Sequence, residues 1–203
     1  MRFQSLCYRE NFRKIGWWLH RKISKRGSKV SKLTLDPVIR AEQPEDFPTI
    51  RAVNLAVFPT PFEADLVDRL RQRAQPTVSQ VAVVDDTIVG HIFFSPVHIS
   101  KRDDLKVMGL APTAVLPAYQ RQGIGSALVR SGLAVCQALG YGAVVVLGHP
   151  SYYPRFGFVP TARTGLRCVY DVPVEAFMML ELQPGYLQDV QGIVTYHPAF
   201  DDV

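Results

Sequence analysis

The sequence predicts an α/β domain, and three observations carry this prediction. Strand-like and helical patterns follow one another in the order β-α-α-β-β-β-α-β between residues 38 and 147. Within that order, a strand-like stretch runs through a glycine-containing turn into a long helix over 113–138. The run 143–147 is wholly apolar and bounded by glycines, which is typical of a strand buried on both faces.

The first half of the domain contains a strand, two helices and a hairpin. A short strand at 38–40 is followed by a helix that begins at Pro44, where an early proline and two acids favour a helix start. A proline-containing break at 58–61 separates this helix from a second one over 63–73. The apolar stretches within 81–94 flank an Asp-Asp-Thr turn, so they predict a β-hairpin.

The second half contains the long helix and the buried strand. A strand is expected over 107–116, and the helix after it begins at Ile124. Small or apolar residues recur through this helix at helical spacing, which predicts its buried face. These positions are 124, 127, 128, 131, 134, 135 and 138. A short helix and more strand are expected after residue 147.

Length and composition indicate one globular domain with an extension. The chain has 203 residues, of which 47% are hydrophobic and 20% are charged. No apolar run approaches the ~18 residues that a membrane-spanning helix needs. Cys7, Cys136 and Cys168 are widely separated and lack metal-ligand spacing. We therefore expect a cytoplasmic protein without disulfides, structural zinc or any other metal.

The positive net charge of +5 comes from the N-terminal segment. Residues 1–36 carry ten Lys and Arg against two acids, whereas residues 37–203 carry thirteen against sixteen, a balance of −3. We expect 1–36 to be a poorly ordered basic extension and 37–203 to be the domain. The extension fits a nucleic-acid or anionic-membrane arm, an organellar transit peptide, a partner-binding tail, or a leader with no part in the fold.

The turn between the predicted strand and the long helix has the features of an anion site. The strand ends at Pro117, and Gly123 and Gly125 lie where the helix begins. Free backbone N–H groups and the positive end of the helix dipole favour phosphates there. The turn is not a Walker loop, since no Gly-Lys-Ser/Thr follows, and it lacks the third glycine and the later acid of a Rossmann fingerprint.

Two motifs resemble those of the GCN5-related N-acetyltransferases (GNAT family). Gln120-x-x-Gly123-x-Gly125 resembles the family's pyrophosphate-binding motif, and Tyr153-x-x-Phe-Gly-Phe158 resembles its second landmark. The two occur in the family's order, about 30 residues apart, with the expected helix and strand between them. Gly109–Pro112 and the tail 194–200 further resemble a group of small bacterial predicted acetyltransferases.

The resemblance implies the acyl-CoA N-acyltransferase fold, a mixed and mostly antiparallel sheet flanked by helices. It also implies acetyl-CoA as cosubstrate, with no metal. The pantetheine arm would pair with the backbone of Val115 and Leu116 in a cleft where this strand and 143–147 separate. The expected contacts to the rest of the cosubstrate are Gln120, Arg121, Gln122, Gly123, Ile124, Gly125 and Ser126.

Acetyl transfer to an amine needs an acid near the departing thiolate and a proton acceptor on the amine side. Tyr153 occupies the family's tyrosine position and is our candidate acid, with its neighbour Tyr152 in reserve. Glu63 follows the break between the first two helices, where the family builds its acceptor site, and is our candidate base. His91, His149 and a water molecule are the alternatives.

These features predict an N-acetyltransferase that moves the acetyl group to a primary amine by direct attack in a ternary complex. The acceptor is expected to be a small molecule or a peptide, and the negative balance of 37–203 favours a cationic one. The alternative is a non-catalytic acyl-CoA-binding sensor or interaction module. Nucleic acid or anionic membrane would bind only through 1–36, and the sequence leaves open whether the chain forms a homodimer.

Overall fold

The computed structural model describes residues 36–202, so the expectations for residues 1–35 lie outside the described part of the chain. The α-helices are α2 (Phe47–Val57), α3 (Phe62–Arg73) and α4 (Ile124–Ala138). The strands are β1 (Val38–Ala41), β2 (Val78–Val84), β3 (Thr87–Ile99), β4 (Val107–Val115), β5 (Ala143–Leu147), β6 (Val159–Pro160), β7 (Gly165–Cys168), β8 (Phe177–Glu181) and β9 (Gln191–Thr195). None of the described helices is both long and apolar enough to span a lipid bilayer.

The strands form one mixed sheet in the order β1-β2-β3-β4-β5-β8-β6. Strand β9 pairs with the end of β3 and with β7. Among the strands of residues 36–202, only the β4–β5 and β7–β9 pairs are parallel, and the other pairs are antiparallel. The predicted mixed, mostly antiparallel sheet is therefore confirmed, as is the order of elements through β5.

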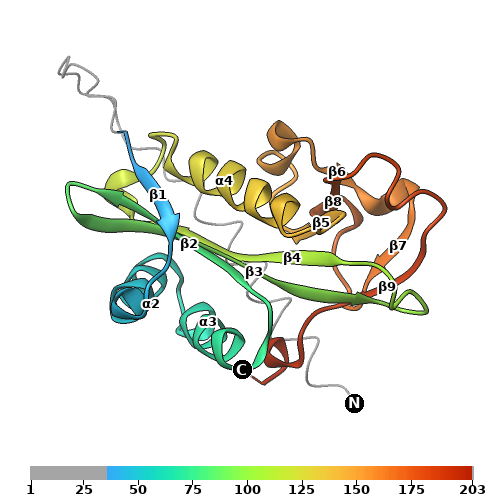
Figure 1. Ribbon diagram of the computed structural model, residues 1–203, viewed down its shortest axis with the longest axis horizontal. Helices are drawn as coiled ribbons and strands as arrows, with labels where there is room; N and C mark the ends of the chain where they lie inside the picture. Colours follow the sequence, from blue (N-terminus) through green and yellow to red (C-terminus); the bar gives the residue numbers. More distant parts are fainter. Residues whose placement is uncertain (1–35, 203) are drawn as a thin grey trace.

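Helices cover both faces of the sheet (Figure 1), α4 on one face and α2 with α3 on the other. Successive residues of β3 show this alternation, because Ile92 and Phe94 belong to the core under α4, whereas Phe93 belongs to the core under α2 and α3. All three side chains are fully buried. The sheet therefore separates two apolar cores, one under α4 and the other under α2 and α3.

The buried face of α4 is rotated from the one that the spacing predicted. The buried positions are Ile124, Leu128, Val129, Gly132, Leu133 and Cys136, whereas residues 131, 134, 135 and 138 are not buried. The reason is Gly132, where a β-carbon would lie 2.3 Å from the ring of Phe94. Because glycine leaves room for this ring, α4 lies closest to the sheet at a residue that hydrophobicity alone does not identify.

Candidate active site

The centre of the candidate site is the place where β4 and β5 separate. Their parallel pairing extends only from Val107 opposite Ala143 to Leu110 opposite Val146. After an irregularity at 111–112, residues 113–115 of β4 again pair with β3, and no described strand pairs with their other side. An extended ligand can therefore add to this open edge through backbone hydrogen bonds, as peptides do at other free sheet edges.

The backbone geometry at the end of β4 supports the addition of a ligand to this open edge. The Leu116 N–H donates to the Val89 carbonyl in β3 at 2.9 Å. Because the peptide bond is planar and trans, the Val115 carbonyl of the same peptide points away from β3, toward the open edge. The Gln120 side-chain amide donates to this carbonyl at 2.8 Å. Gln120 therefore fixes the loop to the strand end, with one of its two N–H groups used in doing so.

The loop after β4 forms a concave array of backbone N–H groups. Arg121 and Gly123 both have left-handed backbone conformations, with φ angles of +61° and +90°. The first helical hydrogen bond runs from the Ala127 N–H to the Gly123 carbonyl, so the N–H groups of 124–126 have no acceptor within α4. A β-carbon at Gly123 would meet no atom of the described residues within 4 Å, so this backbone is open to a ligand. Such a turn at a helix start binds phosphates.

Tyr152 covers the start of α4. A β-carbon at Gly125 would lie 3.0 Å from the Tyr152 hydroxyl, so the lack of a side chain at Gly125 leaves room for this hydroxyl. The two adjacent tyrosine rings meet edge to face with their centroids 5.1 Å apart. The Arg155 guanidinium lies 4.7 Å from the centre of the Tyr152 ring, and its Nε donates to the Tyr152 carbonyl. Tyr152 is therefore next to the phosphate loop rather than in the core.

Tyr153, the candidate acid, lies in the core under α4. Its ring packs against Gly148, where a β-carbon would lie 2.3 Å away, and edge to face on Phe158 at 5.5 Å between centroids. Burial raises the pKa of Tyr153 well above its usual range, and the Thr113 hydroxyl on the open part of β4 partly opposes this rise. The phenol is therefore protonated at neutral pH, which is the form that an acid requires.

Glu63, the candidate base, lies in the first turn of α3 and is largely buried. Its Oε2 atom is buried and makes no hydrogen bond to any described residue. Burial raises the pKa of Glu63 to about 7, and a backbone N–H opposes the rise. A carboxylate with a pKa near neutral can both accept and release a proton, and so it suits general base catalysis.

The two candidate histidines have environments that differ from that of Glu63. His91 is fully buried, and its ring nitrogens lie 3.3 Å from Asn54 Nδ2 and 2.9 Å from Ser79 Oγ. The Ser79 hydroxyl donates to the Glu42 carboxylate, which pairs with Arg71. Burial lowers the pKa of His91 to about 3, so its ring is neutral and forms part of a closed polar chain.

His149 contributes through its backbone. Its carbonyl accepts from the Tyr152 N–H at 3.0 Å and so starts the turn that carries the two tyrosines. Among residues 36–202 no cluster of three or more His, Cys, Asp or Glu could hold a metal ion.

Arg121 was the one arginine predicted at the phosphate loop, and the sequence contains a broader signal of positive charge around it. Residues 105–170 contain no Asp or Glu but six Lys and Arg. This stretch includes the open part of β4, the phosphate loop, α4 and both tyrosines. A positive field with no acids around a nest of N–H groups matches the charge of a polyphosphate.

The comparisons with known proteins agree with this geometry. The family model "Acetyltransferase (GNAT) family" matches residues 39–158. The "Uncharacterized N-acetyltransferase YhbS" of Escherichia coli K12 is 39% identical over 165 residues, which are 81% of this chain and 98% of that relative. The chain therefore belongs to the GNAT acetyltransferase family, and the predicted family is confirmed.

Two solved structures share both the fold and substantial identity. The crystal structure of E. coli YhbS in complex with CoA has a TM-score of 0.78 and 38% identity, covering 82% of this chain and 93% of that one. A GNAT acetyltransferase from Brucella melitensis in complex with acetyl-CoA has a TM-score of 0.66 and 37% identity, covering 81% and 98%. The acyl-CoA N-acyltransferase fold is confirmed.

Proposed function

We propose that this protein transfers the acetyl group of acetyl-CoA to a primary amine by direct attack within a ternary complex. The observation that carries the proposal is Glu63, whose Oε2 is buried and without a hydrogen bond to any described residue and whose pKa is raised to about 7. Burial disfavours the charged form of a carboxylate, and carboxylates with pKa values raised in this way are concentrated at functional sites. A role as proton acceptor for the ammonium group of the substrate explains the environment of Glu63.

The residues present fit acetyl-CoA. The N–H groups of 124–126 and the loop from Gln120 to Gly123 would hold the pyrophosphate, and the open edge of β4 at Val115 would pair with the pantetheine arm. The relatives that were crystallised with CoA and acetyl-CoA support this assignment. When bound, acetyl-CoA supplies a thioester that is activated toward amines.

Two side chains would move the protons. The carboxylate of Glu63 accepts a proton from the ammonium group, so that the amine has a free electron pair for attack. The phenol of Tyr153 donates its proton toward the departing sulfur, and its burial keeps it protonated until then. Tyr153 belongs to the core under α4, whereas Glu63 lies on α3, on the opposite face of the sheet.

The acceptor is proposed to be cationic. Residues 37–203 carry sixteen acids against thirteen Lys and Arg. This negative balance favours an amine in its protonated form over an anionic one. A small polyamine-like molecule and a lysine or N-terminal amine of a peptide both meet this requirement.

Calorimetric titration with CoA and acetyl-CoA, followed by an amine screen with Glu63→Gln as control, tests the proposal. We expect binding of both ligands, and turnover of at least one cationic amine that falls strongly in the variant. Binding without turnover of any amine would instead support a non-catalytic acyl-CoA-binding module. Absence of binding would contradict both functions.

A further inference from the structure

A chain of hydrogen-bonded side chains runs from α3 across the sheet to α2, on the face opposite α4. At one end the Arg71 guanidinium donates to the Glu42 carboxylate through Nε at 2.8 Å and through Nη2 at 2.9 Å. The Ser79 hydroxyl donates to the same carboxylate, and its oxygen lies 2.9 Å from His91 Nε2. At the other end, His91 Nδ1 lies 3.3 Å from Asn54 Nδ2. The chain therefore connects a half-buried ion pair with a fully buried amide.

The partners in this chain fix the direction of each hydrogen bond. The Ile50 carbonyl can only accept, so the atom of Asn54 that lies 2.9 Å from it is the amide nitrogen. The same nitrogen faces His91 Nδ1, which therefore accepts, and the network assigns the single proton of this neutral ring to Nε2. This proton is donated to the Ser79 oxygen, whose own proton goes to Glu42. Both N–H groups of Asn54 are thus used.

One atom of the chain is left without a donor. Asn54 is fully buried, and its Oδ1 accepts no hydrogen bond from any residue in 36–202. Turning the amide over would not help, because it would place Oδ1 against the Ile50 carbonyl oxygen. A buried acceptor without a donor is unfavourable, and here its neighbours in the chain are all paired. An N–H group of a ligand would supply the missing donor.

The second buried oxygen on this face of the sheet belongs to Glu63, on the neighbouring helix. Arg51 of α2 pairs with Asp65 of α3 at 2.6 Å, which aligns the two helices. From this ion pair toward the connection 58–61, Asn54 lies about 4.5 Å along α2 and Glu63 about 3 Å along α3. The two residues are therefore at nearly the same level of the helix pair.

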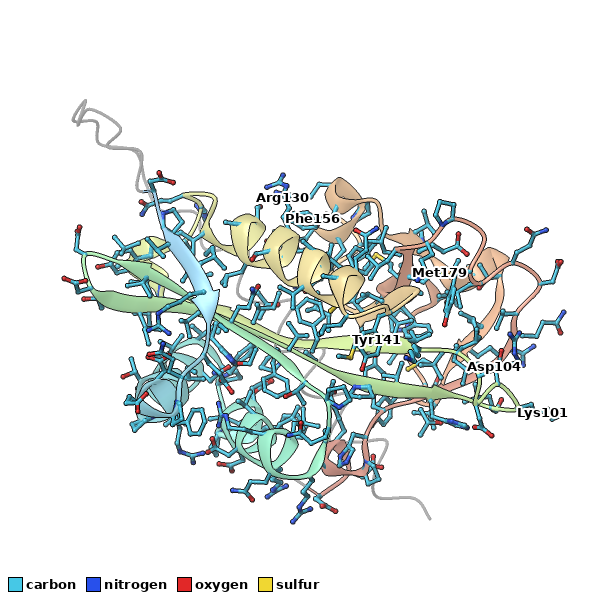
Figure 2. All side chains as sticks on the ribbon, viewed as in Figure 1. Lys101, Asp104, Arg130, Tyr141, Phe156 and Met179 are labelled. Carbon is cyan, nitrogen blue, oxygen red and sulfur yellow. The ribbon has the colours of Figure 1, made fainter. Side chains whose placement is uncertain are left out.

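The arrangement of the helices brings both oxygens toward one region. Figure 1 shows α2 and α3 side by side on one face of the sheet, and Figure 2 shows side chains filling the layer between them and the sheet. Axes of packed helices are about 8–10 Å apart, a separation that side chains from both helices and one small ligand can span. His91, which holds Asn54, pairs with Ala114 in the open part of β4. The amide therefore lies near the open edge to which the proposed function assigns the pantetheine arm.

We propose that Asn54 Oδ1 accepts an N–H of the acceptor amine while Glu63 takes its proton, and that the chain from Arg71 to His91 holds the amide in this orientation. The inference rests on the proposed function, because it takes an ammonium group as the partner of Glu63. An amine that has given one proton to Glu63 still has an N–H for Asn54, and this hydrogen bond orients its free electron pair. His91 and Ser79 act through Asn54 and are positioning residues.

NMR spectroscopy of the ¹⁵N-labelled full chain with excess CoA tests the ammonium site. Methylammonium is the probe, and tetramethylammonium is the matched cation, which has the same charge but no N–H. We expect methylammonium to shift the side-chain amide signals of Asn54 in a saturable way and tetramethylammonium to leave them unchanged. We also expect the ring nitrogens of His91 to show the Nε2–H tautomer. Equal effects of the two cations, no effect of either, or an Nδ1–H tautomer would overturn the proposal.

Two serine variants test the positioning role. Ser79→Ala removes the acceptor of the His91 proton and so no longer fixes Nδ1 as the acceptor for Asn54. It is expected to raise KM for an amine found in the screen about tenfold, with a smaller change in kcat. Ser95→Ala is the matched control, since this serine of β3 is buried and its Oγ has no hydrogen bond to a described residue. Equal effects of the two variants on KM would contradict the positioning role.

The outcomes separate this inference from the proposed function. Turnover of an amine without a shift specific to methylammonium at Asn54 would overturn the ammonium site and leave the acetyltransferase proposal intact. A specific shift without turnover of any amine would support the site and contradict the transfer reaction.

Discussion

The two faces of the sheet differ in how their charges are compensated. On the face of α2 and α3, acids and arginines form a connected set of ion pairs, from Glu42 through Arg71, Asp68 and Arg51 to Asp65. On the α4 side, the stretch 105–170 has no acids, and its arginines at 130 and 155 form no ion pair with a described residue. Ion pairs of this kind stabilise a surface modestly, whereas the exposed guanidinium groups of Arg130 and Arg155 are solvated by water.

Glu63 is the exception on the α2 and α3 face. Its neighbours in the same helix, Asp65 and Asp68, both pair with Arg51, but Glu63 has a buried oxygen without a hydrogen bond to a described residue. Under the proposed function, this comparison divides the reaction between the faces, with an anionic cosubstrate on the side of α4 and proton removal from a cationic amine on the other. Four variants can break or sharpen this division.

Gly123→Glu is expected to have the largest effect. It places a carboxylate where the backbone is open to the pyrophosphate, and repulsion between charges at about 4 Å is on the order of 4 kcal/mol near a surface. We predict that acetyl-CoA affinity falls about 1,000-fold, measured by calorimetry. Gly140→Glu is the matched control, because Gly140 also has a positive φ (+80°) and open surroundings, but lies at the other end of α4. Equal loss in both variants would contradict a phosphate site at the loop.

Glu63→Gln is expected to reduce acetyl transfer about 100-fold at pH 8, as loss of a general base does. In the wild type, kcat/KM should rise with pH through about 7, because only the ionised carboxylate accepts a proton. The variant should lose this ascending limb while binding acetyl-CoA normally. A variant with the same pH profile as the wild type would show that another group is the base.

The same variant also has a predicted effect on stability. The pKa of Glu63 is raised on folding, so the neutral carboxyl stabilises the fold at low pH, and this stability is lost as pH rises from about 4.5 through 7. Discounted for the partial solvent contact of the side chain, the loss is about 1–2 kcal/mol. Glu63→Gln should thus raise Tm at pH 8 and not at pH 4.5, and an equal effect at both pH values would contradict the raised pKa.

Tyr153→Phe is expected to reduce kcat about tenfold, with little change in acetyl-CoA affinity. The effect is smaller because a thiol has a pKa of about 8.5, so the thiolate leaves even without an acid. Tyr152→Phe is the comparison variant, since its hydroxyl lies at Gly125 beside the phosphate loop. Tyr152→Phe should reduce acetyl-CoA affinity more than kcat. A variant that reduces kcat more than affinity would indicate that Tyr152, and not Tyr153, is the acid.

Gly132→Ala is expected to have the smallest effect on the chemistry. Its main effect is expected on the free energy of unfolding. The added methyl group would lie 2.3 Å from the Phe94 ring, so α4 must move or the ring must turn. Overpacking of this kind costs about 1–3 kcal/mol, measurable by chemical denaturation. Gly140→Ala, which meets nothing within 4 Å, is the control for the glycine change itself. A Gly132→Ala variant as stable as the wild type would contradict the close contact of α4 with the sheet.

The sequence contained enough to predict the order of elements, the mixed sheet and the family. The apolar run 143–147 and the turn at Gly123 are local signals, and both are in the expected places. The site depended on contacts between distant residues, which local patterns do not report. The closed chain from His91 to Arg71 joins β3, β2 and α3, and the face of α4 depends on how Phe94 fits at Gly132.

A groove between α4 and the 3-10 helix Tyr153–Phe156, lined in part by Arg130 and Arg155, could not be predicted for the same reason. The two residues are 25 positions apart, and only the packing of the tyrosine-bearing turn against α4 makes them opposite walls of one channel. The absence of Asp and Glu between residues 105 and 170 is evident in the sequence. This charge pattern is the local signal that indicates a positively charged region.

A crystal structure of the complex with acetyl-CoA would test the central claim most directly. The account predicts the pyrophosphate on the N–H groups of 124–126, the pantetheine along the open edge of β4, and the thioester sulfur within hydrogen-bond reach of the Tyr153 hydroxyl. A pyrophosphate bound away from residues 120–126, or a thioester distant from Tyr153, would contradict it.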